Sequence, residues 1–377
     1  MKRLQMVLLA IMATMLFACK PVQPVDPNSF HLGSGVLILN EGVYQFSDGG
    51  SLTFYDPEAD TVANKLFYKA NGIPIGDVPE SMALLDGKLY IVVNSGNYIY
   101  KVDANTVALD TTKPYQLCGF YSPREMQVVA PNKAYVSDLI GKGLWIINPQ
   151  DMTHCGFVDT GKTTEKIVQV GNELYVSNWS NYYFPSMEKN TVQVVDINND
   201  VKVAEITVGK EPNTMVVDKN GHVWVLCEGA TWQADGEKPT MWEINPMLKT
   251  AQCRYTFNDV VDPETGEVIR FAASNMKADP TGRYFYVIVS HVDEDGDASD
   301  SEVRRFDVET QQFSETFSIS SEGNTFYNMA VDSKTGEIYV SRIDNPVLNG
   351  TVYRYTADGV LLSSFEAGIF PSAMLFK

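Results

Sequence analysis

The chain has 377 residues, and 44% of them are hydrophobic, which excludes a wholly disordered protein and is sufficient for a large buried core. Its formal net charge of −18 opposes contact with phosphate backbones, so we expect no nucleic-acid partner.

The N-terminus has the layout of a secretory signal. Residues 1–18 combine the basic pair Lys2 and Arg3 with an apolar stretch, and Cys19 follows directly. The sequence LFAC at 16–19 is typical of a lipobox, whose cysteine is acylated after cleavage. An ordinary signal peptide with an incidental cysteine is the alternative. We predict a signal peptide over 1–18, a lipidated Cys19 with a flexible tether over 19–33, and a folded domain over 34–377, attached to a membrane through lipid alone.

Seven strand-like segments of similar sequence recur along the rest of the chain. They alternate apolar and polar residues and favour Val, Ile, Tyr and Phe, as half-buried strands do. The segments are 36–41, 89–94, 134–139, 174–179, 223–228, 285–290 and 338–343. No stretch sustains the 3.6-residue period of an amphipathic helix, so we expect few helices.

A second repeated element, close to Pro-x-x-Met, precedes six of these segments and also ends the chain. Its copies begin at Pro79, Pro123, Thr164, Pro212, Ala273, Phe326 and Pro371. The segment at 36–41 has no such element before it, and the copy at Pro371 has no strand after it, so circular closure pairs the two. The pattern predicts an all-β fold: a seven-bladed β-propeller of four-stranded blades, closed by the C-terminal strand joining the N-terminal blade.

Blade topology then places the polar residues of these repeats on one face. The start of each first strand and the loop after each second strand lie at the same end of a blade. The variable residues of the repeated element should surround the channel mouth there: Glu80, Arg124, Glu165, Asn213, Asn275, Tyr327 and Ser372. The second strands end beside them at Asn40, Asn94, Asp138, Asn178, Glu228, His291 and Arg342. The methionines of the element should pack between blades.

Two loops on this face are rich in aromatic residues. Residues 178–184 read NWSNYYF, and residues 227–242 read CEGATWQADGEKPTMW. Exposed aromatic rings suit a partly apolar ligand, although the loops could instead fold back on neighbouring blades. The candidate ligand-binding residues are Glu80, Asn94, Arg124, Asp138, Asn178, Trp179, Tyr182, Tyr183, Asn213, Glu228, Trp232, Tyr327 and Arg342.

Motifs for enzyme chemistry are missing from the sequence. It has no nucleophile elbow, zinc helix or phosphate loop, and only His291 of its four histidines could reach the channel mouth. We therefore expect no catalytic residues. Glu80, Asn213 and Asn275 could imitate the metal-binding ring of a propeller hydrolase, which leaves a metal-dependent hydrolase as a minority alternative.

Neither the acidic loop nor the cysteines indicate a firm metal site. Asp293, Asp295, Asp297 and Asp300 could offer oxygens to calcium, but the EF-hand's twelfth-position glutamate is absent, so we favour a solvated hairpin over calcium. The cysteines lack metal-ligand spacing, and we interpret them as packing residues first and possible disulfide partners second. These are Cys118, Cys155, Cys227 and Cys253.

The lipobox, the tether and blades carrying KLYIVVN, IYKVDANT, ELYVSNW and VQVVDIN resemble the YncE-like propeller lipoproteins, in particular the BtuG type. The resemblance covers essentially the whole mature chain. It implies an outer-membrane protein at the cell surface that captures cobalamin, or a related corrinoid, and passes it to a TonB-dependent transporter. A corrin, a broad disc fringed with amides, would suit aromatic walls with polar residues between them, and Arg124 or Arg342 could bind the cobalamin phosphodiester. The alternative is a cell-surface scaffold that grips a protein or glycan with the same loops.

Overall fold

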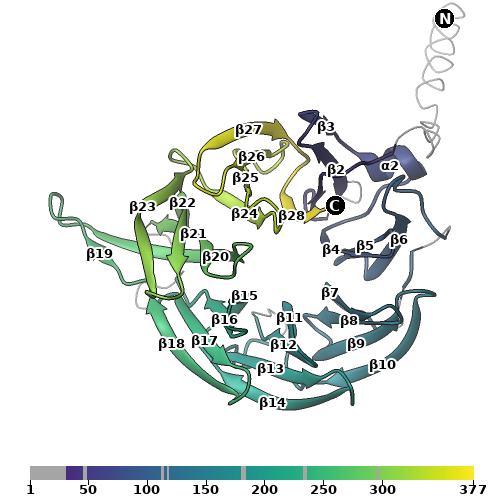
Figure 1. The fold of residues 1–377 in the computed structure, drawn as a ribbon, viewed down its shortest axis with the longest axis horizontal. Helices are drawn as coiled ribbons and strands as arrows, with labels where there is room; N and C mark the ends of the chain where they lie inside the picture. Colours follow the sequence, from purple (N-terminus) through teal and green to yellow (C-terminus); the bar gives the residue numbers. More distant parts are fainter. Residues whose placement is uncertain are drawn as a thin grey trace, which may run out of the picture.

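Seven blades surround a central channel (Figure 1). The ring is closed because the first and last strands of the chain pair in one sheet. The computed structural model describes residues 31–45, 49–111, 114–116, 119–179, 184–231, 236–293 and 297–377. Five sheets have four strands, one has five and one has three. In the three-stranded sheet, two isolated bridges, Ile99 to Tyr115 and Val102 to Leu109, take the position of a fourth strand. The predicted seven-bladed propeller is confirmed.

Each blade runs outward from the channel. The innermost strands are β28 (Pro371–Phe376), β4 (Pro79–Leu85), β7 (Pro123–Ala130), β11 (Ile167–Val170), β15 (Pro212–Val217), β20 (Val268–Ala278) and β24 (Phe326–Val331). The second strands are β1 (Val36–Asn40), β5 (Lys88–Val93), β8 (Lys133–Asp138), β12 (Glu173–Ser177), β16 (Val223–Cys227), β21 (Tyr284–Val292) and β25 (Ile338–Arg342). The predicted second strands agree with these bounds to within two residues.

The outer half of each blade completes the sheet. The third strands are β2 (Ser51–Asp56), β6 (Tyr98–Asp103), β9 (Gly143–Asn148), β13 (Thr191–Asp196), β17 (Thr240–Asn245), β22 (Ala298–Asp307) and β26 (Thr351–Tyr355). The fourth strands are β3 (Thr61–Ala63), β10 (Thr153–Asp159), β14 (Val201–Thr207), β18 (Thr250–Thr256), β23 (Gln312–Ser320) and β27 (Leu361–Glu366). A short β19 (Val260–Val261) extends the sheet of β20, and the helix α2 (Leu66–Asn71) links the first blade to the second.

Large aromatic residues on the second strands join neighbouring blades. Tyr90, Tyr135, Tyr175, Trp224, Tyr286 and Tyr339 occupy equivalent positions and are almost completely buried. Tyr90 donates its hydroxyl hydrogen to the carbonyl of Pro149 at 2.8 Å, and Tyr286 donates to Ala357 at 3.1 Å. Each acceptor lies in the turn between the third and fourth strands of the next blade. Tyr90 and Tyr286 therefore supply both apolar area and a hydrogen bond to the interface with the next blade.

The ring closes through β1 and β28. These strands pair antiparallel, with Val36 opposite Phe376 and Ile38 opposite Met374. Lys377 continues the contact by donating its backbone N–H to Gly35 at 2.8 Å. The seam thus joins residues more than three hundred positions apart.

The end of the predicted tether belongs to the propeller. Leu32 is buried in the apolar cluster of the first two blades, and its N–H donates to Asn105 at 2.9 Å. Burying an apolar side chain beside the closing seam favours this placement over a solvated linker. Leu32 therefore packs against the propeller, although it lies within the predicted tether. Within the described residues, no helix has the length and apolarity needed to cross a bilayer.

The cysteine prediction was partly wrong. Cys227 is buried, as expected of a packing residue, but Cys155 and Cys253 are exposed, and all three are free thiols. Both exposed cysteines lie on outermost strands, β10 and β18, where one face of the sheet meets solvent. Cys118 and Cys19 lie outside the described residues.

Deleting Pro371–Lys377 should abolish cooperative unfolding, because it removes an innermost strand and exposes the backbone of β1 along the seam. Urea denaturation followed by tryptophan fluorescence would measure this. Deleting Lys377 alone is the control, and it should retain a sharp transition. A cooperative transition of normal midpoint in the longer truncation would show that the seam is dispensable.

Candidate functional site

A β-bulge near the start of the innermost strands directs side chains into the channel mouth. In six of the seven blades the register of the innermost pair skips a residue, for example between Pro79 and Ser81 in β4, whereas the pairing of β11 with β12 is regular. The skipped residues include Glu80, Arg124, Asn213, Asn275, Tyr327 and Ser372, six of the seven predicted ring positions. Because a bulged residue is released from the ladder, its side chain can be re-aimed without disturbing the neighbouring strand.

Serine hydroxyls on the second strands hold these bulges in place. The backbone N–H groups of Glu125, Lys166 and Asn328 donate to the hydroxyls of Ser137, Ser177 and Ser341, respectively, at 3.0–3.1 Å. These bonds satisfy N–H groups that the ladder leaves unpaired. The serines were missed in the sequence, although their signal is visible as the recurring YVS of three second strands.

Arg124 is the centre of a charged cluster at the mouth. Its Nε and Nη2 bond both carboxylate oxygens of Glu165 at 2.7 and 3.0 Å, and its Nη1 bonds Glu80 at 2.7 Å. Lys166 lies 3.4 Å from Glu165 and 3.7 Å from Glu80. Two cations and two anions from three blades therefore balance one another. We call these four residues the mouth cluster.

The side chains of the mouth cluster keep their charges because each one is paired with opposite charges in the same cluster. Burial opposes the charged form of Glu165, but Arg124 and Lys166 outweigh it and hold the pKa of this carboxyl below its usual range. Burial likewise opposes the charge on Arg124, and the two glutamates again reverse the effect and raise its pKa. Removing any one member would leave a buried charge without its partner.

Two further glutamates border the cluster. Glu41 accepts a hydrogen bond from the hydroxyl of Tyr327 at 2.9 Å, and burial together with the nearby charge of Glu80 raises its pKa to about 7. Glu228 accepts hydrogen bonds from Asn213 at 2.6 Å and from the indole of Trp179 at 3.0 Å, and burial raises its pKa. The predicted ring residues thus take part in three hydrogen-bonded groups at the mouth, centred on Arg124, Tyr327 and Glu228.

Three predicted site residues instead hold backbone segments. Asp138 is completely buried and accepts hydrogen bonds from the N–H groups of Tyr121 and Ser122 and from the indole of Trp145. Asn178 is equally buried and bonds Thr163 and Thr191. Asn94 donates to Ser122 and to the carbonyl of Pro123. Polar residues at second-strand ends fasten neighbouring loops here, which leaves Asp138 and Asn178 no free face toward the mouth.

The remaining predicted residues are spread over the mouth face. Trp179 is half-buried through its bond to Glu228, so its loop folds back on the next blade in part. Arg342 forms an ion pair with Asp344 at 2.8 Å. Tyr182, Tyr183 and Trp232 lie outside the described residues. Two aromatic residues that were not predicted, Tyr44 and Tyr121, are 65% and 61% exposed in loops of this face.

A hollow of about 510 Å³ opens on the same face beside the first blade. Its walls come from the loop at 49–51, the start of α2 at Lys65–Tyr68 and the loop at 367–369. Tyr68 stands exposed on it, whereas Phe67 and Ile75 form its buried floor. This size lies in the range of small-molecule pockets, and the lining is mostly apolar with a few amides.

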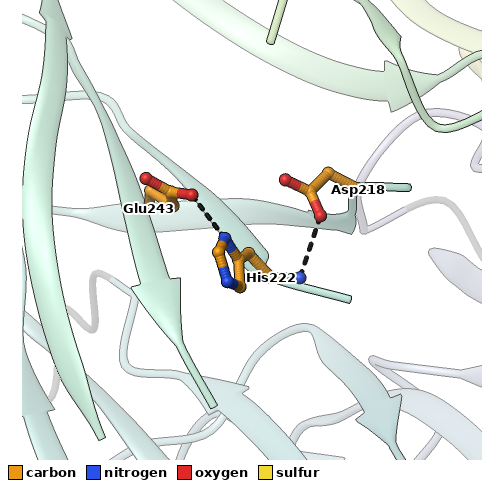
Figure 2. Close-up of side chains that lie close together, drawn as sticks. All are labelled: Asp218, His222 and Glu243. Carbon is orange, nitrogen blue, oxygen red and sulfur yellow. Dashed lines mark hydrogen bonds and ion pairs between the residues drawn. The ribbon is translucent and has the colours of Figure 1, made fainter. Parts of the chain in front are cut away.

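A group of metal-ligand side chains lies at the opposite face. Side-chain atoms of Asp218, His222 and Glu243 lie within 4.8 Å of one another (Figure 2). Asp218 already accepts hydrogen bonds from the N–H of His222 and, at 3.0 Å, from the indole of Trp224. Glu243 also pairs with Arg254 at 2.6 Å. The group is therefore engaged in holding a turn and an outer strand.

The acidic loop can be followed only in part. Asp295 lies outside the described residues. Asp297 donates its N–H to the side chain of Asp293 at 2.9 Å, and Asp300 accepts from Ser321 at 2.9 Å. His291, on β21, packs against Phe271 with ring centres 5.6 Å apart. The solvated hairpin favoured from the sequence stays a prediction, with calcium binding as its alternative.

Comparisons with known proteins agree with the fold. A family described as a domain of unknown function, DUF5074, matches residues 34–377. A comparison with curated protein sequences found no match.

Solved propeller structures are similar over most of their length. One is a quinonprotein alcohol dehydrogenase-like protein from Bacteroides thetaiotaomicron, with a TM-score of 0.63 and 18% identity over 89% of this chain and 78% of that one. Another is the periplasmic gluconolactonase of Pseudomonas aeruginosa, with a TM-score of 0.63 and 12% identity over 91% and 99%. Hydrazine synthase of Kuenenia stuttgartiensis has a TM-score of 0.60 and 14% identity over 78% and 88%. At these identities the likeness concerns the fold alone.

Replacing Arg124 by Met should destabilise the protein by about 3–5 kcal/mol at pH 7, because Glu80 and Glu165 are left buried without their cation. Urea unfolding would measure this. Adding Glu80→Gln and Glu165→Gln should recover most of the loss. The control is Lys202→Met, which removes an exposed pair with Glu205 and should cost less than about 1 kcal/mol. If Arg124→Met and Lys202→Met lowered the free energy of unfolding equally, the mouth cluster would not contribute more than an exposed ion pair.

Because of Glu41, the free energy of unfolding should decrease as the pH rises. The folded protein keeps this carboxyl protonated up to a pKa of about 7, whereas the unfolded chain ionises near 4.5, so the folded state binds more protons between these values. Glu41→Gln should therefore stabilise the protein at pH 8 by on the order of 2 kcal/mol and change little near pH 4. Unfolding curves at both pH values would measure this. If Glu41→Gln changed the free energy of unfolding by the same amount at both pH values, ionisation of Glu41 would not be the cause.

Proposed function

The chain belongs to the DUF5074 family, and we propose that it is a lipid-anchored outer-membrane protein that binds cobalamin or a related corrinoid on its mouth face for delivery to a TonB-dependent transporter. The observation that carries the proposal is the apolar hollow beside Tyr68 on the face where Tyr44 and Tyr121 are exposed. An apolar hollow with an exposed aromatic ring in its lining is typical of a ligand site, because the ring contributes apolar contact to a bound ligand.

The chemistry of this face suits a broad ligand with polar edges. The hollow offers apolar walls, whereas the mouth cluster and the neighbouring asparagine side chains lie toward the channel. Arg342 pairs with Asp344, whose side chain is 50% exposed, so this arginine can exchange its partner for a phosphodiester more easily than Arg124 can. Of the two arginines considered from the sequence, Arg342 is therefore the better candidate.

A metal-dependent hydrolase is less well supported. Glu80 is paired with Arg124, Asn213 donates to Glu228, and Asn275 donates to the carbonyl of Tyr327 at 3.0 Å. A metal ion at the centre of this ring would also face the positive charges of Arg124 and Lys166. A binding protein accordingly fits the ring better than an enzyme of that type. A scaffold for a protein or glycan would use the same aromatic loops without needing the hollow.

Titration of the detergent-solubilised full chain with cyanocobalamin tests the proposal. We expect one-to-one binding by calorimetry and co-elution of the coloured ligand in gel filtration. The variant Tyr44→Ala/Tyr68→Ala/Trp179→Ala should bind at least tenfold more weakly, because it removes three rings from the mouth face. The matched control, Met247→Ala/Leu248→Ala, removes two exposed side chains from a turn on the opposite face and should bind normally.

Folded protein that does not bind cyanocobalamin would contradict the corrinoid proposal and favour the scaffold. Normal binding by the triple variant would keep the ligand and move the site away from the hollow.

A further inference from the structure

The interior of the channel is a second cavity, separate from the hollow on the mouth face. It has a volume of about 280 Å³ and is enclosed by the innermost strands. Its lining includes the polar side chains of Glu125, Lys166, Lys277, Thr214, Asn275 and Asn328 and apolar residues such as Val168 and Leu375. A cavity of this size is at the lower limit of ligand pockets and suits a small molecule.

Lys277 is a half-buried cation without a bonded partner among the described residues. Within the part of the chain that the structure describes, its Nζ has neither a hydrogen bond nor an ion pair, although it lines the cavity. Burial, followed by the repulsion of Lys166, lowers the pKa of its ammonium group. Lys166 cannot share its own anions with Lys277, because Glu80 and Glu165 are engaged in the mouth cluster. The ammonium group of Lys277 is therefore free to bind an anionic group that enters the cavity.

Glu125 is the complementary group. Its Oε2 accepts the N–H of Ile167 at 2.8 Å, but its Oε1 accepts no hydrogen bond from any described residue. Burial raises the pKa of this carboxyl, and Lys166 and Lys277 act against that effect. The side chain is therefore half-satisfied, and it lines the same cavity as Lys277.

The two groups come from opposite sides of the ring. Glu125 lies on β7 and Lys277 on β20, strands of the third and sixth blades that lie across the channel from each other (Figure 1). Glu125 and Lys277 do not form an ion pair with each other, and both side chains line the cavity. An anion alone would compensate Lys277 but approach Glu125, and a cation alone would approach two lysines. A ligand with both charges meets both requirements.

We propose that the channel cavity binds a small zwitterion, a free α-amino acid in its chemistry, with the ligand carboxylate on Lys277 and its ammonium group on Glu125. Thr214, Asn275 and Asn328 offer neutral donors and acceptors for its remaining polar atoms. The apolar side chains of Val168 and Leu375 in the same lining suit a short aliphatic side chain of the ligand. This site does not depend on the corrinoid proposal, since the two ligands occupy different cavities.

Calorimetric titration of the detergent-solubilised full chain with glycine, L-alanine and L-serine tests the site. At least one of these amino acids should bind at millimolar concentration or below. Acetate and methylammonium, each carrying one half of the zwitterion, should bind at least tenfold more weakly at equal ionic strength. Lys277→Met and Glu125→Gln should each weaken amino-acid binding at least tenfold, whereas Lys202→Met on the outer surface should not.

The folding of the variants is controlled independently. Lys277→Met removes an unpartnered charge from a half-buried position, so its melting temperature should equal or exceed that of the unchanged protein. If either variant fails to fold, line broadening of ¹³C-labelled glycine by the unchanged protein, reversed by unlabelled L-alanine, supplies the evidence instead. Absence of both heat and broadening with all three amino acids would overturn the proposal. Equally tight binding of acetate, or normal amino-acid binding by folded Lys277→Met, would overturn it as well.

Discussion

Closure of the ring is the constraint on which every other feature of this molecule depends. No blade buries its faces alone, because its second strand is covered by the blades on either side. The tyrosines that cross these interfaces reach their acceptors only when the neighbouring turn is in place, as Tyr90 does with Pro149. The pairing of β1 with β28 fixes the circumference, and with it the separation of side chains that meet across the channel. Without that seam, the geometry of the mouth would not be defined.

The channel illustrates how a propeller can concentrate charge in its interior. Glu80, Arg124 and Glu165 belong to three successive blades, so each ion is supplied by a different sheet and neutralised by its neighbours. Such a cluster specifies how the blades are arranged as well as contributing energy, because a displaced blade would leave an unpaired buried ion. Lys277 is an exception to this neutrality, and it stands out because its surroundings are otherwise balanced.

The blade order, the closing strand and the ring positions could be predicted because they rest on local periodicity and on a repeated element. The roles of individual ring residues could not, since they depend on contacts between blades. Asp138 appeared to be an exposed polar residue at a strand end, but it is buried because its carboxylate satisfies the backbone of a loop. Cys155 appeared apolar, but it lies on an outermost strand that no blade covers. Lys277 follows Met276 directly, and nothing in the sequence distinguishes it from a solvated lysine.

The bulges near the starts of the innermost strands have a consequence for protein engineering. Because residues such as Asn213 and Ser372 contribute no rung to the ladder and lie outside the mouth cluster, their side chains can be exchanged without altering strand register. A combinatorial library confined to such positions would vary the recognition chemistry of the mouth while leaving the scaffold constant. The bulge thereby separates the evolution of specificity from that of foldability, a division of labour that antibodies achieve with hypervariable loops.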